Sequence, residues 1–436
     1  MKNYFGFKAG QCYCLNFEKG TGKGFLTMKQ KMFFRIIGAA LMIAGVTLGI
    51  GILGLPVQTG LAGIVPSMIL MLVVWLFMLA TGWIIARHVT HSDNPHEDFG
   101  TLFSRSLGLP GKILTYIGYL LLLYGILVAH LAAGGQILKS LGLMDVPLQL
   151  WVLLFFAVST AMGILGGKQI EKASSALLLM LLVVFFALTY FAIRNIVPSR
   201  LTHVDWRFSI SAVPIIVCAL AYHIIIPTVC RVLDNDFRAV KKALVIGTII
   251  PLFINGLWIF AVLGALPLTG DKTSIMAAFK ANEPAVIPLA LAYPGSTIRG
   301  ISLVFSLVVL VLSYVLQATA MISFFNDILS KQLPENRKIF SRLMTFIPAL
   351  TIVLIWPNLF LTALNLTGGV SIVLLCGILP ALIGIQWARK QSRRHYILMV
   401  ALLIFFCAFL ALELAQECGF LKIDPEVEYG PVKIPE

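Results

Sequence analysis

Charged residues are scarce in this sequence: Asp, Glu, Lys and Arg make up 12% of its 436 residues, whereas hydrophobic residues make up 59%. A soluble domain carries about 25% charged residues, so the polar surface that a water-soluble fold needs is missing. The seven cysteines are not paired at the spacing of a disulfide framework, and Cys12 and Cys14 have no nearby His or Cys partner for a metal. We therefore expect a membrane protein without a resident metal or cofactor.

Long apolar runs follow one another along the whole chain. A spanning helix needs about 20 mostly apolar residues, and in lipid each run must satisfy its own backbone as a helix. We expect transmembrane helices at about 33–55, 61–86, 113–138, 148–165, 173–193, 210–229, 243–266, 298–329, 340–356, 359–387 and 396–415, and a short helix within 275–292. The fold class predicted is an all-α membrane protein with about 11 transmembrane helices.

Lysine and arginine are distributed unevenly between the predicted loops. With a cytoplasmic N-terminus, 24 of the 33 basic residues lie in cytoplasmic segments and 9 lie outside. Basic residues mark the cytoplasmic side, so we expect the N-terminus inside and, after an odd number of helices, the C-terminus outside. The formal net charge of +14 is interpreted as this topology signal. The expected partner is the lipid bilayer and not a nucleic acid, and the oligomeric state is left open.

Residues 1–30 differ from the rest of the chain because they are polar, rich in glycine and without an apolar run. They have no hydrophobic region followed by a small-residue cleavage site, which argues against a signal peptide. We interpret them as a disordered extension or as an upstream start that the cell does not use, with Met28 and Met32 just before helix 1.

Helices 1 and 6 both contain features that interrupt a helix. The centre of helix 1 contains Gly45, Gly49 and Gly51, and residues 218–223 of helix 6 are followed by Pro227. Interruptions at corresponding places in two halves are typical of transporters built from inverted repeats. We expect a first repeat of helices 1–5 in residues 31–207 and a second of helices 6–10 in residues 208–390, with helix 11 and the C-terminal tail in residues 391–436.

The ends of two such interrupted helices can hold an amino acid without a charged side chain. The positive end of a half-helix attracts a carboxylate, and free carbonyls at a negative end attract an ammonium group. Of the nineteen acidic residues, only Glu413 in helix 11 lies well within a predicted span. The predicted substrate contacts at the two interruptions are Ala44, Gly45, Val46, Thr47, Gly49, Ala219, Leu220, Ala221, Tyr222 and His223.

The interrupted segments lie in motifs that are shared with a known family. The motifs are residues 40–56 (ALMIAGVTLGIGILGLP), 60–67 (GLAGIVPS), 129–135 (AHLAAGG), 221–223 with Pro227, and 241–251 (KKALVIGTIIP). From about residue 33 to 415 the chain resembles the bacterial aromatic amino acid permeases, the tyrosine- and tryptophan-specific group.

The resemblance implies a leucine-transporter-like fold with two inverted five-helix repeats. It also implies proton-driven uptake of tyrosine, tryptophan or phenylalanine across the bacterial inner membrane, and we expect tyrosine first. Ala221 and Tyr222 stand where the family usually has glycine and phenylalanine, so the choice among the aromatic acids stays open.

Three ionisable residues are candidates for a functional role in the membrane. His223 is expected to hydrogen-bond the substrate or carry the coupled proton, because histidine titrates near physiological pH; a neutral structural histidine is the alternative. His130 is open between substrate contact and helix packing. Lys168, at the start of helix 5, is either a positive-inside anchor or a second proton-coupling candidate in the place of sodium.

Polar groups in helices 1, 3 and 8 complete the predicted site. Thr47, Tyr124, Tyr314 and Gln317 are candidates to bond a phenol or an indole N–H, or else to bond neighbouring helices. Asn365 and Thr367, beside two glycines in helix 10, are candidates for a gate or a further kink.

Several other functions are weighed against uptake of an aromatic amino acid. A permease of the same fold for another substrate, a sodium-coupled permease and a sensor that binds without flux all stay open. The spans contain no repeated polar ring of a channel and no nucleophile–base pair or metal cluster of an intramembrane enzyme.

Overall fold

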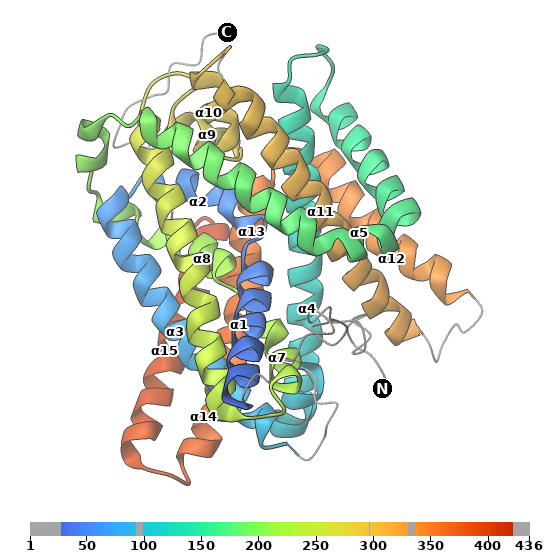
Figure 1. Cartoon of the computed structure of the whole chain (residues 1–436), viewed down its shortest axis with the longest axis vertical. Helices are drawn as coiled ribbons and strands as arrows, with labels where there is room; N and C mark the ends of the chain where they lie inside the picture. Colours follow the sequence, from blue (N-terminus) through green and yellow to red (C-terminus); the bar gives the residue numbers. More distant parts are fainter. Residues whose placement is uncertain (1–27, 93–98, 296, 330–335, 422–436) are drawn as a thin grey trace.

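The computed structural model describes residues 28–92, 99–295, 297–329 and 336–421, with side chains except those of 28–29, 164–181 and 297–298. Within these ranges all regular elements are helical, and Figure 1 shows them gathered into one bundle. Nine helical segments of the described chain are long and apolar enough to cross a membrane, and the apolar stretches Leu148–Gly163 and Leu182–Arg194 are shorter. The all-α membrane fold is confirmed, whereas the count of eleven spans and the inverted repeat stay predictions.

The elements are numbered along the chain. The α-helices are α1 (Met28–Thr47), α2 (Gly51–Gly60), α3 (Ile64–Thr90), α4 (Phe99–Ser140), α5 (Leu148–Arg194), α6 (Val213–Ala219), α7 (Ile226–Val232), α8 (Phe237–Ala265), α9 (Ile275–Ala281), α10 (Val286–Ala292), α11 (Thr297–Leu329), α12 (Arg337–Ile355), α13 (Phe360–Leu366), α14 (Leu379–Ala388) and α15 (Arg393–Glu417). The 3₁₀ turns are η1 (Pro198–Thr202), η2 (Trp206–Phe208), η3 (Ile210–Ala212) and η4 (His223–Ile225), and η5 (Thr367–Ile378) is a π-helix.

Both predicted interruptions are present. Helix 1 is divided into α1 and α2 by residues 48–50, and helix 6 is divided into α6 and α7 by residues 220–222 and the turn η4. Pro227 lies in the first turn of α7, where its missing N–H would have had no partner within the helix. The glycine and proline positions therefore locate the breaks to within a few residues.

Helix 10 is irregular in a different way. Between α13 and α14 it adopts the π-helix η5, which begins at Thr367, the residue expected to mark a gate or kink. An added Cβ at Gly368 would overlap the carbonyl oxygen of Pro214 in α6. The wide π-turn thus brings the backbone of helix 10 directly against the first half of helix 6.

Two helices extend beyond their expected limits. The chain stays helical from Leu148 to Arg194 as the single helix α5. The predicted break between residues 165 and 173 is therefore absent. The intervening residues 166–172 contain two glycines, but also Lys, Gln and Glu, which favour a helix, and no proline. In turn, α4 begins at Phe99, before the expected residue 113, and is kinked at Gly108, whose φ of 67° favours glycine.

A loop between α8 and α11 contains two short helices, α9 and α10, where one was expected. Asn282 joins them with a φ of 58°, and its side-chain oxygen accepts the N–H of Thr362 at 3.0 Å at the start of α13. The N–H of Ala285 donates to the carbonyl of Leu53 in α2 at 2.8 Å. The loop is therefore attached to both interrupted helices 1 and 10, at the end of the bundle opposite the α14–α15 connection (Figure 1).

Candidate functional site

The interruptions of helices 1 and 6 lie against each other. A Cβ added at Gly51, the first residue of α2, would come 3.0 Å from Cα of Ala219, the last residue of α6. The N-terminal end of α2 carries partial positive charge and the C-terminal end of α6 partial negative charge. Two helix ends of opposite sign therefore meet inside the bundle, an arrangement that suits a zwitterion.

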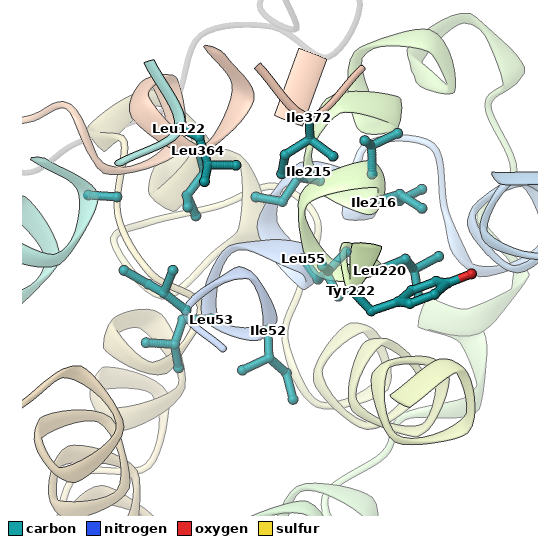
Figure 2. Close-up of a cluster of buried hydrophobic side chains, with 14 of the residues drawn as sticks. Ile52, Leu53, Leu55, Leu122, Ile215, Ile216, Leu220, Tyr222, Leu364 and Ile372 are labelled. Atoms are coloured by element: carbon teal, nitrogen blue, oxygen red, sulfur yellow. The ribbon is translucent and has the colours of Figure 1, made fainter. Parts of the chain in front are cut away.

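Buried apolar side chains surround this junction. Figure 2 shows Ile52, Leu53 and Leu55 of α2, Leu122 of α4, Ile215 and Ile216 of α6, Leu220 and Tyr222 of the break, Leu364 of α13 and Ile372 of η5. Small-molecule sites are usually lined in this way, by apolar walls with a few placed polar groups. The side chains that pack around the two helix ends are thus almost all apolar.

His223 and Tyr222 attach the break of helix 6 to α3. The His223 Nε2 atom lies 2.8 Å from Thr81 Oγ1 and 3.1 Å from the carbonyl oxygen of Met78, and Tyr222 Oη donates to the same carbonyl at 3.0 Å. The two rings stack with centroids 4.5 Å apart. Because Thr81 Oγ1 itself donates to a backbone carbonyl of α3, His223 Nε2 acts as the donor here. Its fully buried Nδ1 is an acceptor with no partner among the described residues.

The helix 1 candidates differ in exposure. Ala44 and Thr47 are buried, Gly45 and Gly49 are half-buried, and Val46 is 50% exposed. The Thr47 hydroxyl donates to the carbonyl of Ile43 at 2.7 Å, so it is satisfied within its own helix. The structure therefore brings the backbone at Gly51 to the junction, whereas the Val46 side chain is on an exposed face.

The polar candidates in helices 3 and 8 bond to neighbouring helices. Tyr124 donates to the Met344 carbonyl of α12, and Tyr314 shares a hydrogen bond of 2.7 Å with Thr160 of α5. Gln317 reaches the Leu123 carbonyl of α4 at 3.5 Å. These three side chains hold α4, α5, α11 and α12 together in this structure.

The remaining ionisable candidates are His130 and Lys168. The buried His130 donates from Nδ1 to the carbonyl of Ile126 at 2.7 Å within α4, which leaves its Nε2 as an acceptor without a partner in the described chain. Lys168 falls in the segment 164–181, whose side chains lie outside the described part. Its place relative to helix 1 thus stays a prediction.

Asn255 of α8 borders the junction and was not among the predicted site residues. Its amide Nδ2 donates to the carbonyl of Ala219 at 3.3 Å, at the C-terminal end of α6. Its Oδ1 is buried and has no partner among the described residues. The signal in the sequence was a lone amide in an apolar span, which is a functional pointer of the same kind as an intramembrane histidine.

One acidic residue outside the spans, Glu283, lies in the α9–α10 loop that is attached to helices 1 and 10. Glu283 follows Asn282 between α9 and α10. Burial raises the pKa of the Glu283 carboxyl to about 7, although Lys139 and Lys272 act in the opposite direction. The loop therefore carries a group that changes charge near neutral pH.

Comparison with known proteins adds to this geometry. Residues 32–414 match the sequence profile of the tryptophan/tyrosine permease family. The chain is similar to tyrosine-specific transport system 2 of Haemophilus influenzae, with 26% identity over 83% of this chain and 89% of that protein. It is also similar to the tryptophan-specific transport protein of the same organism, with 23% identity over 83% and 88% of the two chains.

Among solved structures, the fold is similar to that of the manganese transporter of Eremococcus coleocola. The TM-score is 0.54 at 14% sequence identity, over 94% of this chain and 92% of the other. At this identity the likeness concerns the fold alone.

Proposed function

Because the chain belongs to the tryptophan/tyrosine permease family, we propose that it imports aromatic amino acids, tyrosine first, by proton symport with alternating access. The observation that carries the proposal is the meeting of α2 and α6 at Gly51 and Ala219 within apolar walls. The similarity to a tyrosine-specific and a tryptophan-specific transporter supports the substrate class. The members of this family are transport proteins and not enzymes.

In this proposal the zwitterionic part of the substrate binds at the helix ends. The positive end of α2 attracts the carboxylate, and the carbonyls at the end of α6 attract the ammonium group. The unpaired acceptors His223 Nδ1 and Asn255 Oδ1 suit the ammonium N–H groups or a phenol donor. The aromatic ring would pack among the side chains of Figure 2, against α4 and η5.

The coupling ion and the orientation are also proposals. His223 and Lys168 stay proton-coupling candidates, and sodium is the alternative ion. We place the protein in the bacterial inner membrane with the N-terminus cytoplasmic and the C-terminus outside, on the distribution of basic residues. The two inverted repeats, residues 31–207 and 208–390, would supply the two halves that move during alternating access.

Transport of labelled amino acids into proteoliposomes tests the proposal. Purified protein should accumulate tyrosine when the outside is more acidic, and unlabelled tryptophan and phenylalanine should compete. Failure of all three aromatic acids to enter would refute the substrate class, and uptake that requires sodium at constant pH would refute proton coupling. Saturable equilibrium binding combined with zero flux would instead favour the sensor.

A further inference from the structure

Glu413 is a buried acidic side chain in the last helix, outside the predicted substrate site. It lies in the span of α15 and is 4% exposed. It lines a small cavity of about 10 Å³ together with Gln416 of α15, Gly369 and Val373 of η5, and Val213 and Pro214 of α6. Such a carboxyl within a membrane span is costly to keep charged, and it usually has a function.

The carboxyl packs directly on the π-helix. A Cβ added at Gly369 would come 2.5 Å from Cγ and 2.7 Å from Cδ of Glu413. A Cβ added at the preceding residue, Gly368, would overlap the Pro214 carbonyl oxygen and lie 3.1 Å from Cβ of Cys218 in α6. The two glycines thus connect Glu413 through one turn of η5 to the half-helix whose end, Ala219, meets α2.

The surroundings of Glu413 favour a proton as its partner. Residues of η3, α6 and η5 that line the cavity are apolar and not titratable, and the other polar lining group is Gln416. The neighbouring acid is the exposed Glu417, one turn further along α15, and Cys218 is the titratable group of α6 beside Gly368. No described basic residue lines the cavity, so charge on Glu413 can be neutralised there by protonation but not by an ion pair.

We propose that Glu413 binds the proton that is transported with each substrate molecule, and that its protonation lets α15 close on η5 and hold helix 10 against α6. The carboxylate takes one proton from the outer aqueous phase and releases it to the cytoplasm after the substrate leaves. This proposal rests on the proposed function and assigns its coupling site to helix 11 in place of His223 or Lys168.

The test compares Glu413→Gln with the matched control Glu417→Gln in the full chain reconstituted in proteoliposomes. In 1:1 symport a pH gradient of about one unit drives about tenfold accumulation of tyrosine. We expect wild type and Glu417→Gln to reach this value and Glu413→Gln to reach only equal concentrations on both sides. Exchange of internal for external tyrosine should persist in Glu413→Gln, because exchange needs no net proton release.

The outcomes separate the two proposals. If wild type does not accumulate tyrosine in a pH gradient, proton symport itself is wrong. If wild type accumulates tyrosine and Glu413→Gln does so equally, only the role of Glu413 is wrong.

A second measurement uses the wild-type protein and does not depend on the folding of a variant. A carbodiimide, which attacks protonated carboxyls in apolar surroundings, should modify Glu413 in proteoliposomes, with mass spectrometry as the readout. Modified protein should no longer accumulate tyrosine. The fraction of Glu413 that is modified should decrease as the pH rises, because less of the carboxyl is protonated. An unmodified Glu413 in protein that has lost accumulation would overturn the inference.

Discussion

The close approach of Gly51 to Ala219 allows a sharp test of the helix junction. In Gly51→Ala the new Cβ would lie 3.0 Å from Cα, 3.2 Å from Cβ and 3.3 Å from N of Ala219. These neighbours include backbone atoms, which cannot rotate away as the end of a flexible side chain can. Helices α2 and α6 must therefore move apart by a few tenths of an ångström or stay strained.

The expected size of the effect follows from this crowding. Adding a methylene to a tightly packed interior costs about 1–3 kcal/mol. If the strain falls on the closed, substrate-bound state, the same free energy corresponds to a loss of about 5- to 150-fold in tyrosine affinity or uptake. The thermal unfolding midpoint in detergent should decrease much less than uptake if the open state can relieve the crowding.

The control is Gly38→Ala, because an added Cβ at Gly38 of α1 has no heavy atom within 4 Å. This variant should keep both uptake and thermal stability. The double variant Gly51→Ala/Ala219→Gly should recover part of the uptake, since it removes the side-chain atom at 3.2 Å but leaves the backbone of α6 equally near. Normal uptake by Gly51→Ala, or an equal loss in Gly38→Ala, would show that the junction does not limit transport.

Three further predictions concern single side chains. Burial raises the pKa of Glu283 from 4.5 to about 7 in the folded state. The free energy that holds the α9–α10 loop in place is therefore at its full value below about pH 4.5, and it decreases by up to about 3 kcal/mol as the pH rises through 7. The protection of the amides of residues 275–292 against hydrogen exchange, relative to their intrinsic rates, should decrease over this pH range. In Glu283→Gln this protection should no longer depend on pH. Asn255→Leu should lower tyrosine binding about tenfold, because the Ala219 carbonyl loses its donor at a cost of about 1–3 kcal/mol; unchanged binding would argue against a role at the junction. His223→Phe should abolish uptake in protein that still elutes as a single species. Thr81→Val removes one of the two hydrogen-bond partners of His223 Nε2 and should reduce uptake only severalfold. Equal effects of the two variants would indicate a structural role for His223.

The breaks in helices 1 and 6 were predictable because their cause is local. Gly49 and Gly51 lower the helix propensity of their segment, and Pro227 suits the first turn of a helix. The two glycines after Thr367 also predicted an irregularity in helix 10, which the structure has as the π-helix η5. Residue type alone does not produce a break, because α8 and α12 continue through Pro251 and Pro348.

The partners of the site side chains were not predictable, because they depend on packing between distant segments. His223 bonds to Met78 and Thr81, which are 145 and 142 residues away, and Tyr314 pairs with Thr160 across 154 residues. Asn255 was overlooked because its partner, Ala219, becomes a free acceptor only where α6 ends. Continuity of α5 depends on whether a polar segment between two apolar runs leaves the helix, which composition alone does not decide.

Helix 11 has a larger part in the bundle than its place outside the predicted repeats implies. An added Cβ at Gly369 would press on Glu413, and one at Gly377, two turns later in η5, would clash with the ring of Phe406. Two side chains of α15 thus pack onto two glycines of the same π-helix, where any larger residue would separate the helices. A π-helix is rare and usually only one turn long, and the twelve residues of η5 have these two tight contacts with α15. The positions of α15 and η5 are therefore linked by direct contact, and Gly368 extends this chain of contacts to α6.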